Sequence, residues 1–329
     1  MLNLVELFDS LPATSDGENR FLATPIEGYE RHRLGKDAQG RPLLLISLND
    51  TQSQRASAPI VLEHLTVMHN VDCRISRPDG IHEAGRFTVV RCTGGDVTLH
   101  TYFLRIASTI VVSLSERPSQ LQVTGVINKL IELFRAMTKP PRKSTQGLWA
   151  ELFLIARTRQ PAVLIQAWHA MPEDRYDFAL DNQQVEVKSV AGRVRQHYFS
   201  LEQLQPPEGT NVLIASMFVE RTQAGPSIVE LAEKIRTRIS GDPDLLLYMD
   251  RIIGLTLGDS WRYASEERFD GKLTEESLAF FEASAIPSVN PNLPFGVSEV
   301  RFKSDLTGIP TAKVVRYREE GGLFKVVLC

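Results

Sequence analysis

Two carboxylates and a lysine on neighbouring strand-like segments are the residues of this sequence best placed to do chemistry together. Asp177 lies in RYDFAL, and Glu186 and Lys188 follow in QQVEVKSV. Because alternate residues of a strand share one face, Glu186 and Lys188 point the same way and the intervening valines point to the other. Charges are costly to bury in a sheet core, so we expect the charged face to open to a cleft.

A hairpin would bring these charges to one place. If the two segments pair across Asp181–Asn182, Asp177 lies near Glu186, and two adjacent carboxylates repel unless a cation joins them. Oxygen ligands suit Mg²⁺ better than His or Cys does. We therefore predict that Asp177, Glu186 and the Val187 carbonyl hold Mg²⁺, for which Mn²⁺ can substitute. Lys188 can polarise a water or neutralise charge on a phosphate, as metal-assisted hydrolysis requires.

The segments around this charged set predict a mixed α/β unit. Helical spacing and a possible cap at Ser144 or Thr145 indicate a helix over 144–159. Strand-like segments, a short polar segment, a continuous apolar run and a further helix follow, over 175–180, 183–190, 195–200, 200–204, 211–220 and 227–240. Toward the end of the chain we expect a helix over 274–283 and a strand over 297–306.

The first part of the chain predicts a mainly antiparallel β unit. Residues that favour strands are concentrated over 41–48, 59–69, 85–92, 96–104 and 108–114. Turn residues between 85–92 and 96–104 indicate a hairpin there, and apolar spacing predicts a helix over 123–137. The adjacent prolines at 140 and 141 stop that helix, so we place the domains at 1–138 and 139–329. The first is expected to be an accessory domain.

The motif set resembles the PD-(D/E)XK nuclease superfamily, which has the restriction-endonuclease-like fold. Asp177, then Glu186-x-Lys188, preceded by a helix that carries Glu151, makes up the resemblance. More narrowly, GLWAELFLI, RYDFAL, VEVKS and HYFSLEQL together resemble a bacterial PD-(D/E)XK family found beside defence and restriction-modification genes. That narrower resemblance covers most of the chain.

The resemblance implies a mixed sheet flanked by helices in α-β-β-β-α-β order. It also implies that Asp177 and Glu186 ligate Mg²⁺, that Lys188 is the catalytic lysine, and that Glu151 supplies a further acid directly or through water. One departure is that Tyr176 stands where the superfamily pattern has proline.

Basic residues after the charged set are candidates for binding substrate. Arg193, Arg195 and His197 suit a phosphate backbone, and a solvated hairpin tip is the alternative explanation. Gln203 could reach the cleft or lie on a helix surface. The basic linker Lys139–Lys143 could contact phosphate or be solvated.

Composition excludes several classes of protein. Lys and Arg number 37 and Asp and Glu 40, so a uniformly basic nucleic-acid coat is excluded. The 3 cysteines form no CxxC pair, which argues against a disulfide scaffold and a cysteine zinc site. The sequence has no long apolar run and no basic leader, so we expect a cytoplasmic protein that does not enter a membrane. No Walker A, GxGxxG, GxSxG or HExxH motif occurs.

The charged set predicts a metal-dependent nuclease, specifically a Mg²⁺-dependent phosphodiesterase that acts on DNA. The family resemblance implies that it is an endonuclease of a bacterial phage-defence or restriction-modification system. A non-catalytic subunit that binds nucleic acid or a partner in a defence complex is the alternative. A third interpretation is an enzyme that cuts only when a partner ATPase or methyltransferase delivers DNA. A double-strand cut by one site per chain would favour a homodimer.

Overall fold

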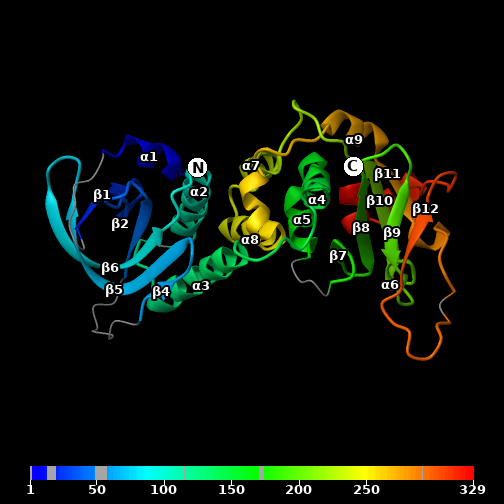
Figure 1. The fold of residues 1–329 in the computed structure, drawn as a ribbon, viewed down its shortest axis with the longest axis horizontal. Helices are drawn as coiled ribbons and strands as arrows, with labels where there is room; N and C mark the ends of the chain where they lie inside the picture. The colour runs from blue at the N-terminus through cyan, green and yellow to red at the C-terminus, as the bar shows by residue number, and fades with distance from the viewer. Residues whose placement is uncertain (1, 13–19, 49–57, 115, 170–173, 291) are drawn as a thin grey trace. The chain divides into compact units, whose positions relative to one another are not determined.

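The computed structural model describes residues 2–12, 20–48, 58–114, 116–169, 174–290 and 292–329 (Figure 1). The chain forms two compact units. The first comprises Met1–Lys139 with Gly241–Gly254, and the second comprises Pro140–Ser240 with Leu255–Cys329. Residues 241–254 fold with the first unit, which a single division of the chain at 138/139 does not anticipate. The roles assigned to the two parts of the chain stay proposals.

The first unit contains a sheet with the strand order β1-β2-β3-β6-β5-β4, which closes on itself because β1 also pairs with β5. The β1–β5 pairing is parallel, and the other pairings are antiparallel. Phe21, Leu43, Leu45, Ile75 and Val89 pack into one of its buried clusters. The strands are β1 (Arg20–Ile26), β2 (Tyr29–Lys36), β3 (Pro42–Ser47), β4 (Ile60–Val61), β5 (Leu65–Ser76) and β6 (His82–Cys92). The antiparallel prediction is confirmed, but the closure was not expected.

Helices α1 (Leu4–Ser10), α2 (Val97–Ser113) and α3 (Gln120–Ala136) follow the chain through the first unit. The helix predicted over 123–137 is α3. The strands predicted over 96–104 and 108–114 are wrong because both segments lie in α2. Asp96 caps this helix at the Thr98 N–H, and apolar side chains at helical spacing form its buried face. Helical spacing therefore overrides the β-branched composition.

The hairpin predicted between 85–92 and 96–104 is wrong for the same reason. Strand β6 pairs with β3 and β5 instead.

Helix α8 (Pro243–Leu257) contributes its residues up to Gly254 to the first unit. A Cβ on Gly254 would lie 2.1 Å from Leu133 Cδ1, so the absence of a side chain lets α8 approach α3 closely.

The second unit contains a mixed sheet with the order β11-β10-β8-β7. Strands β8 and β10 are parallel, whereas β7–β8 and β10–β11 are antiparallel. Strand β9 pairs with β12 in a separate antiparallel ribbon. The strands are β7 (Phe178–Leu180), β8 (Gln183–Val190), β9 (Gln196–Ser200), β10 (Asn211–Phe218), β11 (Ala279–Glu282) and β12 (Arg301–Asp305). A mixed sheet flanked by helices is consistent with the restriction-endonuclease-like fold expected from the sequence.

Helices cover the valine face of β8, and the ribbon lies against the other face. On the first face, Gln183 accepts a hydrogen bond from the Phe324 N–H of α11. On the second, Phe199 of β9 packs with Val212 and Ile214 of β10. The remaining elements are α4 (Thr145–Arg157), α5 (Pro161–Ala167), α6 (Leu201–Leu204), α7 (Ile228–Arg238), η1 (Gly258–Tyr263), α9 (Gly271–Ser277), η2 (Ala283–Ala285), α10 (Val314–Glu319) and α11 (Gly322–Val327).

The order α4-β7-β8-β9-α6-β10-α7 matches the predicted α-β-β-β-α-β-α sequence, with α5 added between α4 and β7. The helix predicted over 274–283 is partly wrong, since α9 ends at Ser277 and 279–282 forms β11. The apolar pair Phe280–Phe281 continues the sheet beside β10 there. The strand predicted over 297–306 is β12.

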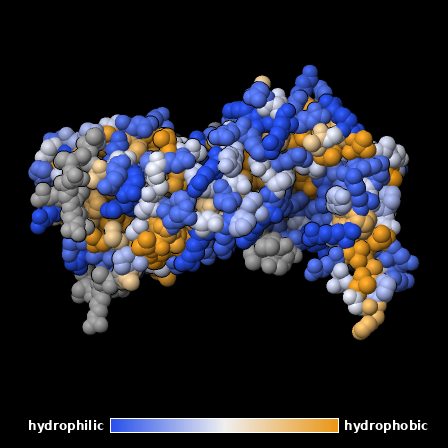
Figure 2. All heavy atoms as spheres, viewed as in Figure 1, coloured by the Kyte–Doolittle hydropathy of each residue, from blue (hydrophilic) through white to orange (hydrophobic). Residues whose placement is uncertain are grey.

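Exposed apolar side chains gather in the loop between η2 and β12. Val289, Phe295 and Val297 are exposed there, and a hydrophobic group of atoms lies at this place in Figure 2. This loop leads directly into strand β12.

Within the described ranges, no helix has the length and apolarity needed to cross a bilayer.

Candidate active site

The β7–β8 hairpin brings Asp177 beside the strand that carries Glu186. Asp181 forms the turn with a φ of 52°, a left-handed conformation that aspartate tolerates better than most residues. The register pairs Phe178 with Val185, which places Asp177 one position further along, opposite the Glu186 region. The Val187 N–H donates to Asp177 Oδ2 at 2.8 Å. Asp177 therefore lies beside β8, just before β7, the strand at the edge of this sheet.

Glu151 approaches the same edge from helix α4. Ser144 caps this helix by accepting from the Gly147 N–H, and the later turns of α4 are buried in the core. The Glu151 carboxylate is buried at 4% exposure. The Trp168 indole N–H donates to Glu151 Oε2 at 2.7 Å. The other oxygen accepts from Lys143 Nζ at 2.7 Å, and the same ammonium contacts Asp177 Oδ1.

Glu186 and Lys188 lie on the face of β8 that meets the ribbon. Lys188 Nζ is 2.8 Å from Glu186 Oε1 and 5.0 Å from the centre of the Phe199 ring. Gln203 links the pair, because its amide N–H donates to Glu186 at 2.7 Å and its carbonyl accepts from Lys188 at 3.2 Å. Gln203 thus reaches the cleft, one of the two positions considered from the sequence.

The short helix α6 holds Gln203 in place. Ser200 and Gln203 form a reciprocal capping box at its first turn. The Tyr176 hydroxyl donates to the carbonyls of Glu202 and Gln203, both at 3.3 Å. The tyrosine that replaces the proline of the superfamily pattern therefore anchors the helix that carries a residue of the site.

These side chains line a pocket of about 560 Å³, which we call the acid pocket. Its floor contains the buried carboxylates of Glu151, Asp177 and Glu186, and exposed arginines line its outer part. The lining residues are Arg142, Lys143, Glu151, His169, Asp174, Arg175, Tyr176, Asp177, Glu186, Lys188, Tyr198, Phe199, Ser200, Gln203, Thr256 and Arg301. An anionic floor below a cationic rim suits a phosphate group bound above a cation.

Burial controls the protonation of the acid pocket. It raises the pKa of Glu151 to about 8, with the Asp177 carboxylate adding to the shift and Lys143 opposing it. Burial and Asp177 likewise raise the pKa of Glu186 to about 7, against the opposing effect of Lys188. Burial lowers the pKa of Lys143, but Asp177 and Glu151 outweigh it and hold that pKa above its usual range. The positive charges of Lys143 and Lys188 therefore do not fully offset the effect of burial on the pKa values of Glu151 and Glu186.

The donors at the acid pocket are chemically suited to a hard divalent cation. Asp177 and Glu186 offer carboxylate oxygens. The Val187 carbonyl lies on the same edge of β8 as the Val187 N–H, which donates a hydrogen bond to Asp177. Among the described residues, no group of three or more His, Cys, Asp and Glu side chains is arranged to hold a metal directly. The ammonium of Lys143 lies between Glu151 and Asp177, and Lys188 with Gln203 engages Glu186. Cationic and amide groups thus contact the oxygens that a metal would use.

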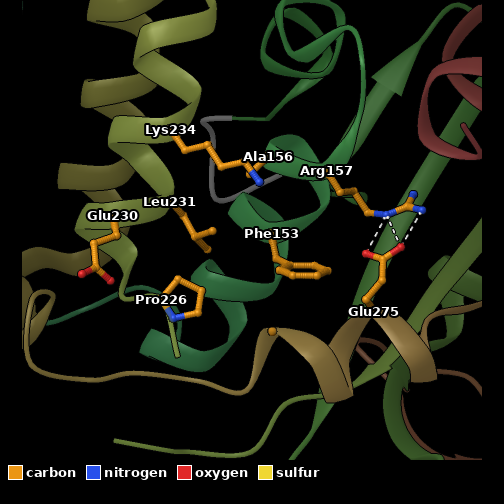
Figure 3. A pocket seen from close by; sticks show the side chains of 9 residues that line it. Phe153, Ala156, Arg157, Pro226, Glu230, Leu231, Lys234 and Glu275 are labelled. Atoms are coloured by element: carbon orange, nitrogen blue, oxygen red, sulfur yellow. Dashed lines mark hydrogen bonds and ion pairs between the residues drawn. The ribbon is translucent and has the colours of Figure 1, made fainter. Parts of the chain in front are cut away.

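A second pocket, of about 470 Å³, lies among α4, α7 and α9 and is chemically different (Figure 3). Phe153, Pro226 and Leu231 form its apolar part, and Arg157 pairs with Glu275 at 3.1 Å at its side. The acid pocket is the stronger candidate because it gathers buried carboxylates with shifted pKa values beside a lysine.

The structure gives Arg193, Arg195 and His197 partners within the fold. Arg193 is exposed and pairs with Glu220 at 2.8 Å. Arg195 donates to the carbonyl and hydroxyl of Ser216, both at 2.8 Å, and the His197 ring lies 2.8 Å from the same hydroxyl. Burial, followed by Lys188 and Arg195, lowers the pKa of His197 to about 4, so its ring is neutral. These residues do not line the acid pocket, and substrate binding by them stays a prediction.

Several residues of the acid pocket were not singled out from the sequence. Lys143 is predicted only as part of a basic linker, whereas Arg175, Tyr198, Arg301 and Trp168, which donates to Glu151 from outside the pocket lining, are not predicted as site residues. Trp168 precedes the hairpin and Arg301 comes much later in the chain, so local spacing carries no signal for either. For Tyr198 the alternation with His197 on β9 gives a partial signal, because it separates the two faces without showing which one is buried.

A helix glutamate, an aspartate beside the sheet and a Glu-x-Lys strand thus meet on a mixed sheet, the arrangement that the resemblance to the PD-(D/E)XK superfamily implies. The sequence model of one family matches residues 4–307, and its description reads "Putative PD-(D/E)XK family member, (DUF4420)". The chain belongs to this family. No curated protein and no solved structure matches the chain.

Proposed function

We propose that this protein is a Mg²⁺-dependent nuclease that hydrolyses phosphodiester bonds of DNA as an endonuclease. Membership of a PD-(D/E)XK family supports nuclease chemistry. The observation that carries the proposal is the acid pocket, where Glu151, Asp177 and Glu186 converge at 4%, 8% and 5% exposure beside the Lys188 ammonium. Burying these carboxylates together costs stability, and a site for a cation offers a functional reason for that cost.

Asp177, Glu186 and the Val187 carbonyl would hold Mg²⁺, with Glu151 adding an acid directly or through water. The bound ion would supply a Lewis acid and lower the pKa of a nearby water. Lys188 orients the attacking water or balances charge on the phosphate, while Gln203 keeps its ammonium close to Glu186. The arginines of the rim bind the flanking phosphates.

A nicking assay on supercoiled plasmid with Mg²⁺ or Mn²⁺ tests this function. We expect Glu186→Gln and Lys188→Met each to abolish nicking. Glu276→Gln and Lys272→Met are matched controls, because these exposed residues form an i,i+4 pair on α9 outside the acid pocket. The controls should nick like the parent. Parental rates in both site variants would overturn the assignment of the site.

We further propose that the protein works in the bacterial cytoplasm within a defence or restriction-modification system. This proposal rests on the family resemblance. The chain would cut as a homodimer, or when a partner ATPase or methyltransferase delivers DNA. Phage plating on cells that carry the gene with its native neighbours tests the idea. Protection lost in Glu186→Gln, but kept in Glu276→Gln, supports it, and equal plating on all strains contradicts it.

A further inference from the structure

We propose that the outward face of the β9–β12 ribbon binds a single strand of nucleic acid that leads into the acid pocket. Tyr198 would stack on an unpaired base, and Arg301 and Lys303 would contact the phosphates. This inference rests on the proposed nuclease function, which it deepens by naming the substrate class as single-stranded or locally opened nucleic acid.

The alternation of β9 creates this face. His197 and Phe199 point into the core, so Tyr198 between them points outward and is 68% exposed. In the antiparallel register Tyr198 lies opposite Lys303, whose ammonium is 5.9 Å from the tyrosine ring centre. Arg301, two residues earlier on β12, shares the outward face with Lys303. An aromatic ring and two cations are thus presented together on a rigid ribbon.

The ribbon face is continuous with the acid pocket. Tyr198, Ser200 and Arg301 line the same pocket as Glu186 and Lys188, so a strand lying on the ribbon can pass directly over the candidate active site. Charge complementarity favours phosphate as the ligand near the pocket.

Carboxylates border this face without occupying its centre. Asp305 lies at the far end of β12, where Gln196 and the Thr307 N–H donate to it at 3.0 and 2.8 Å. Glu299 lies before β12 in the chain. The segment between these acids therefore carries the cations Arg301 and Lys303 on the tyrosine side of the ribbon.

An exposed tyrosine favours a single strand over an intact duplex. Bases in a duplex are already stacked on each other, whereas an unpaired base is free to stack on an aromatic ring. The gain from one such contact is sequence-tolerant because every base has a π-face. The face is therefore suited to holding a strand without selecting its sequence.

Fluorescence anisotropy with labelled oligo-dT in EDTA tests the inference without cleavage. We expect Tyr198→Ala to weaken binding about tenfold and Tyr198→Phe to bind like the parent. Tyr263→Ala is the matched control, since this tyrosine is 56% exposed on η1 and does not line the acid pocket. Oligo-U and duplex DNA are measured in parallel; comparable binding of oligo-U extends the substrate to RNA, whereas tighter binding of duplex than of either single strand contradicts the proposal.

Salt dependence tests the two cations separately from the tyrosine. Each of Arg301→Gln and Lys303→Gln should reduce the slope of log affinity against log salt by about 0.7, as expected for one phosphate contact to a single strand. Lys272→Gln on α9 should leave the slope unchanged. Unchanged slopes in both ribbon variants, or affinity within twofold of the parent in Tyr198→Ala, would overturn the proposal.

Binding and cleavage separate the failure of this inference from the failure of the proposed function. If the parent nicks DNA and Glu186→Gln does not, while Tyr198→Ala binds oligo-dT normally, only the ribbon assignment fails. If Tyr198→Ala loses binding but the parent never cleaves, including with partner proteins present, the nuclease function fails and the binding face stands.

Discussion

The Lys143 ammonium lies 2.7 Å from Oε1 of Glu151, a carboxylate buried on α4. The same ammonium also contacts Asp177, so one lysine joins two acids of the acid pocket. Lys143 comes from the segment just before α4, and its side chain is partly exposed. We therefore expect the ammonium to move toward solvent if a metal cation binds between the two acids.

The first prediction concerns this lysine. Lys143→Met should lower the free energy of unfolding by about 2 kcal/mol without metal, because it leaves buried carboxylates without their cation; the partial exposure of the lysine keeps the loss below that of a fully buried pair. Saturating Mg²⁺ should stabilise the variant more than the parent. Urea unfolding measures both effects. Lys139→Met, at an exposed lysine of the same segment, is the control, and equal stabilisation by Mg²⁺ in all three proteins would contradict the prediction.

The second prediction concerns metal affinity. Trp168→Phe removes the N–H that donates to Glu151 and leaves a buried oxygen without that partner. Because such supporting hydrogen bonds orient metal ligands, Mn²⁺ binding should weaken by about 10–100-fold. Isothermal titration calorimetry measures the dissociation constant. Trp261→Phe, at a tryptophan outside the acid pocket, serves as the control, and identical affinities in both variants would remove Trp168 from the site.

The third prediction concerns pH. The folded state holds protons on Glu186 and Glu151 above the usual carboxyl range, because burial raises both pKa values. Stability without metal should therefore fall as pH rises from about 4.5, through about 7 for Glu186 and about 8 for Glu151, by up to about 1.4 kcal/mol per pH unit for each extra proton bound. Glu186→Gln should flatten this dependence. Urea midpoints at several pH values measure it, and a slope unchanged by the substitution would sink the idea.

The fourth prediction separates structural from exposed basic residues. His197→Ala should lower the free energy of unfolding by about 2 kcal/mol, because His197 is buried and hydrogen-bonded to Ser216. Arg193→Ala should change stability by about 0.5 kcal/mol or less, since its pair with Glu220 is exposed. Thermal and urea unfolding give these values. If His197→Ala keeps parental stability but loses oligo-dT binding, its role is in the substrate site.

Much of the catalytic pattern could be predicted from sequence because it depends on short-range rules. The alternation of Val185, Glu186, Val187 and Lys188 places the charged pair on one face of a strand whatever surrounds it. The short turn at Asp181–Asn182 makes the hairpin that carries Asp177 a local event as well. The helix before it has a local cap at Ser144.

Sequence-based prediction fails where composition and local spacing disagree, or where the partners of a segment lie far along the chain. Segments 96–104 and 108–114 have strand-like composition, but α2 buries them as a helix packed in the first unit. On β9 the sequence shows two alternating faces without showing which is buried. Packing of Phe199 against Val212 and Ile214 of β10 buries one face and leaves Tyr198 facing outward.

The sequence by itself determined which residue types stand on β8 and at what spacing, because strand periodicity is a property of the local backbone. Only the tertiary structure decided that Lys143 joins Glu151 to Asp177, that Trp168 and Gln203 hold the acids, and that Arg301 completes the rim. Those contacts join segments separated by many residues. Their formation depends on how whole elements pack, which no short stretch of sequence encodes.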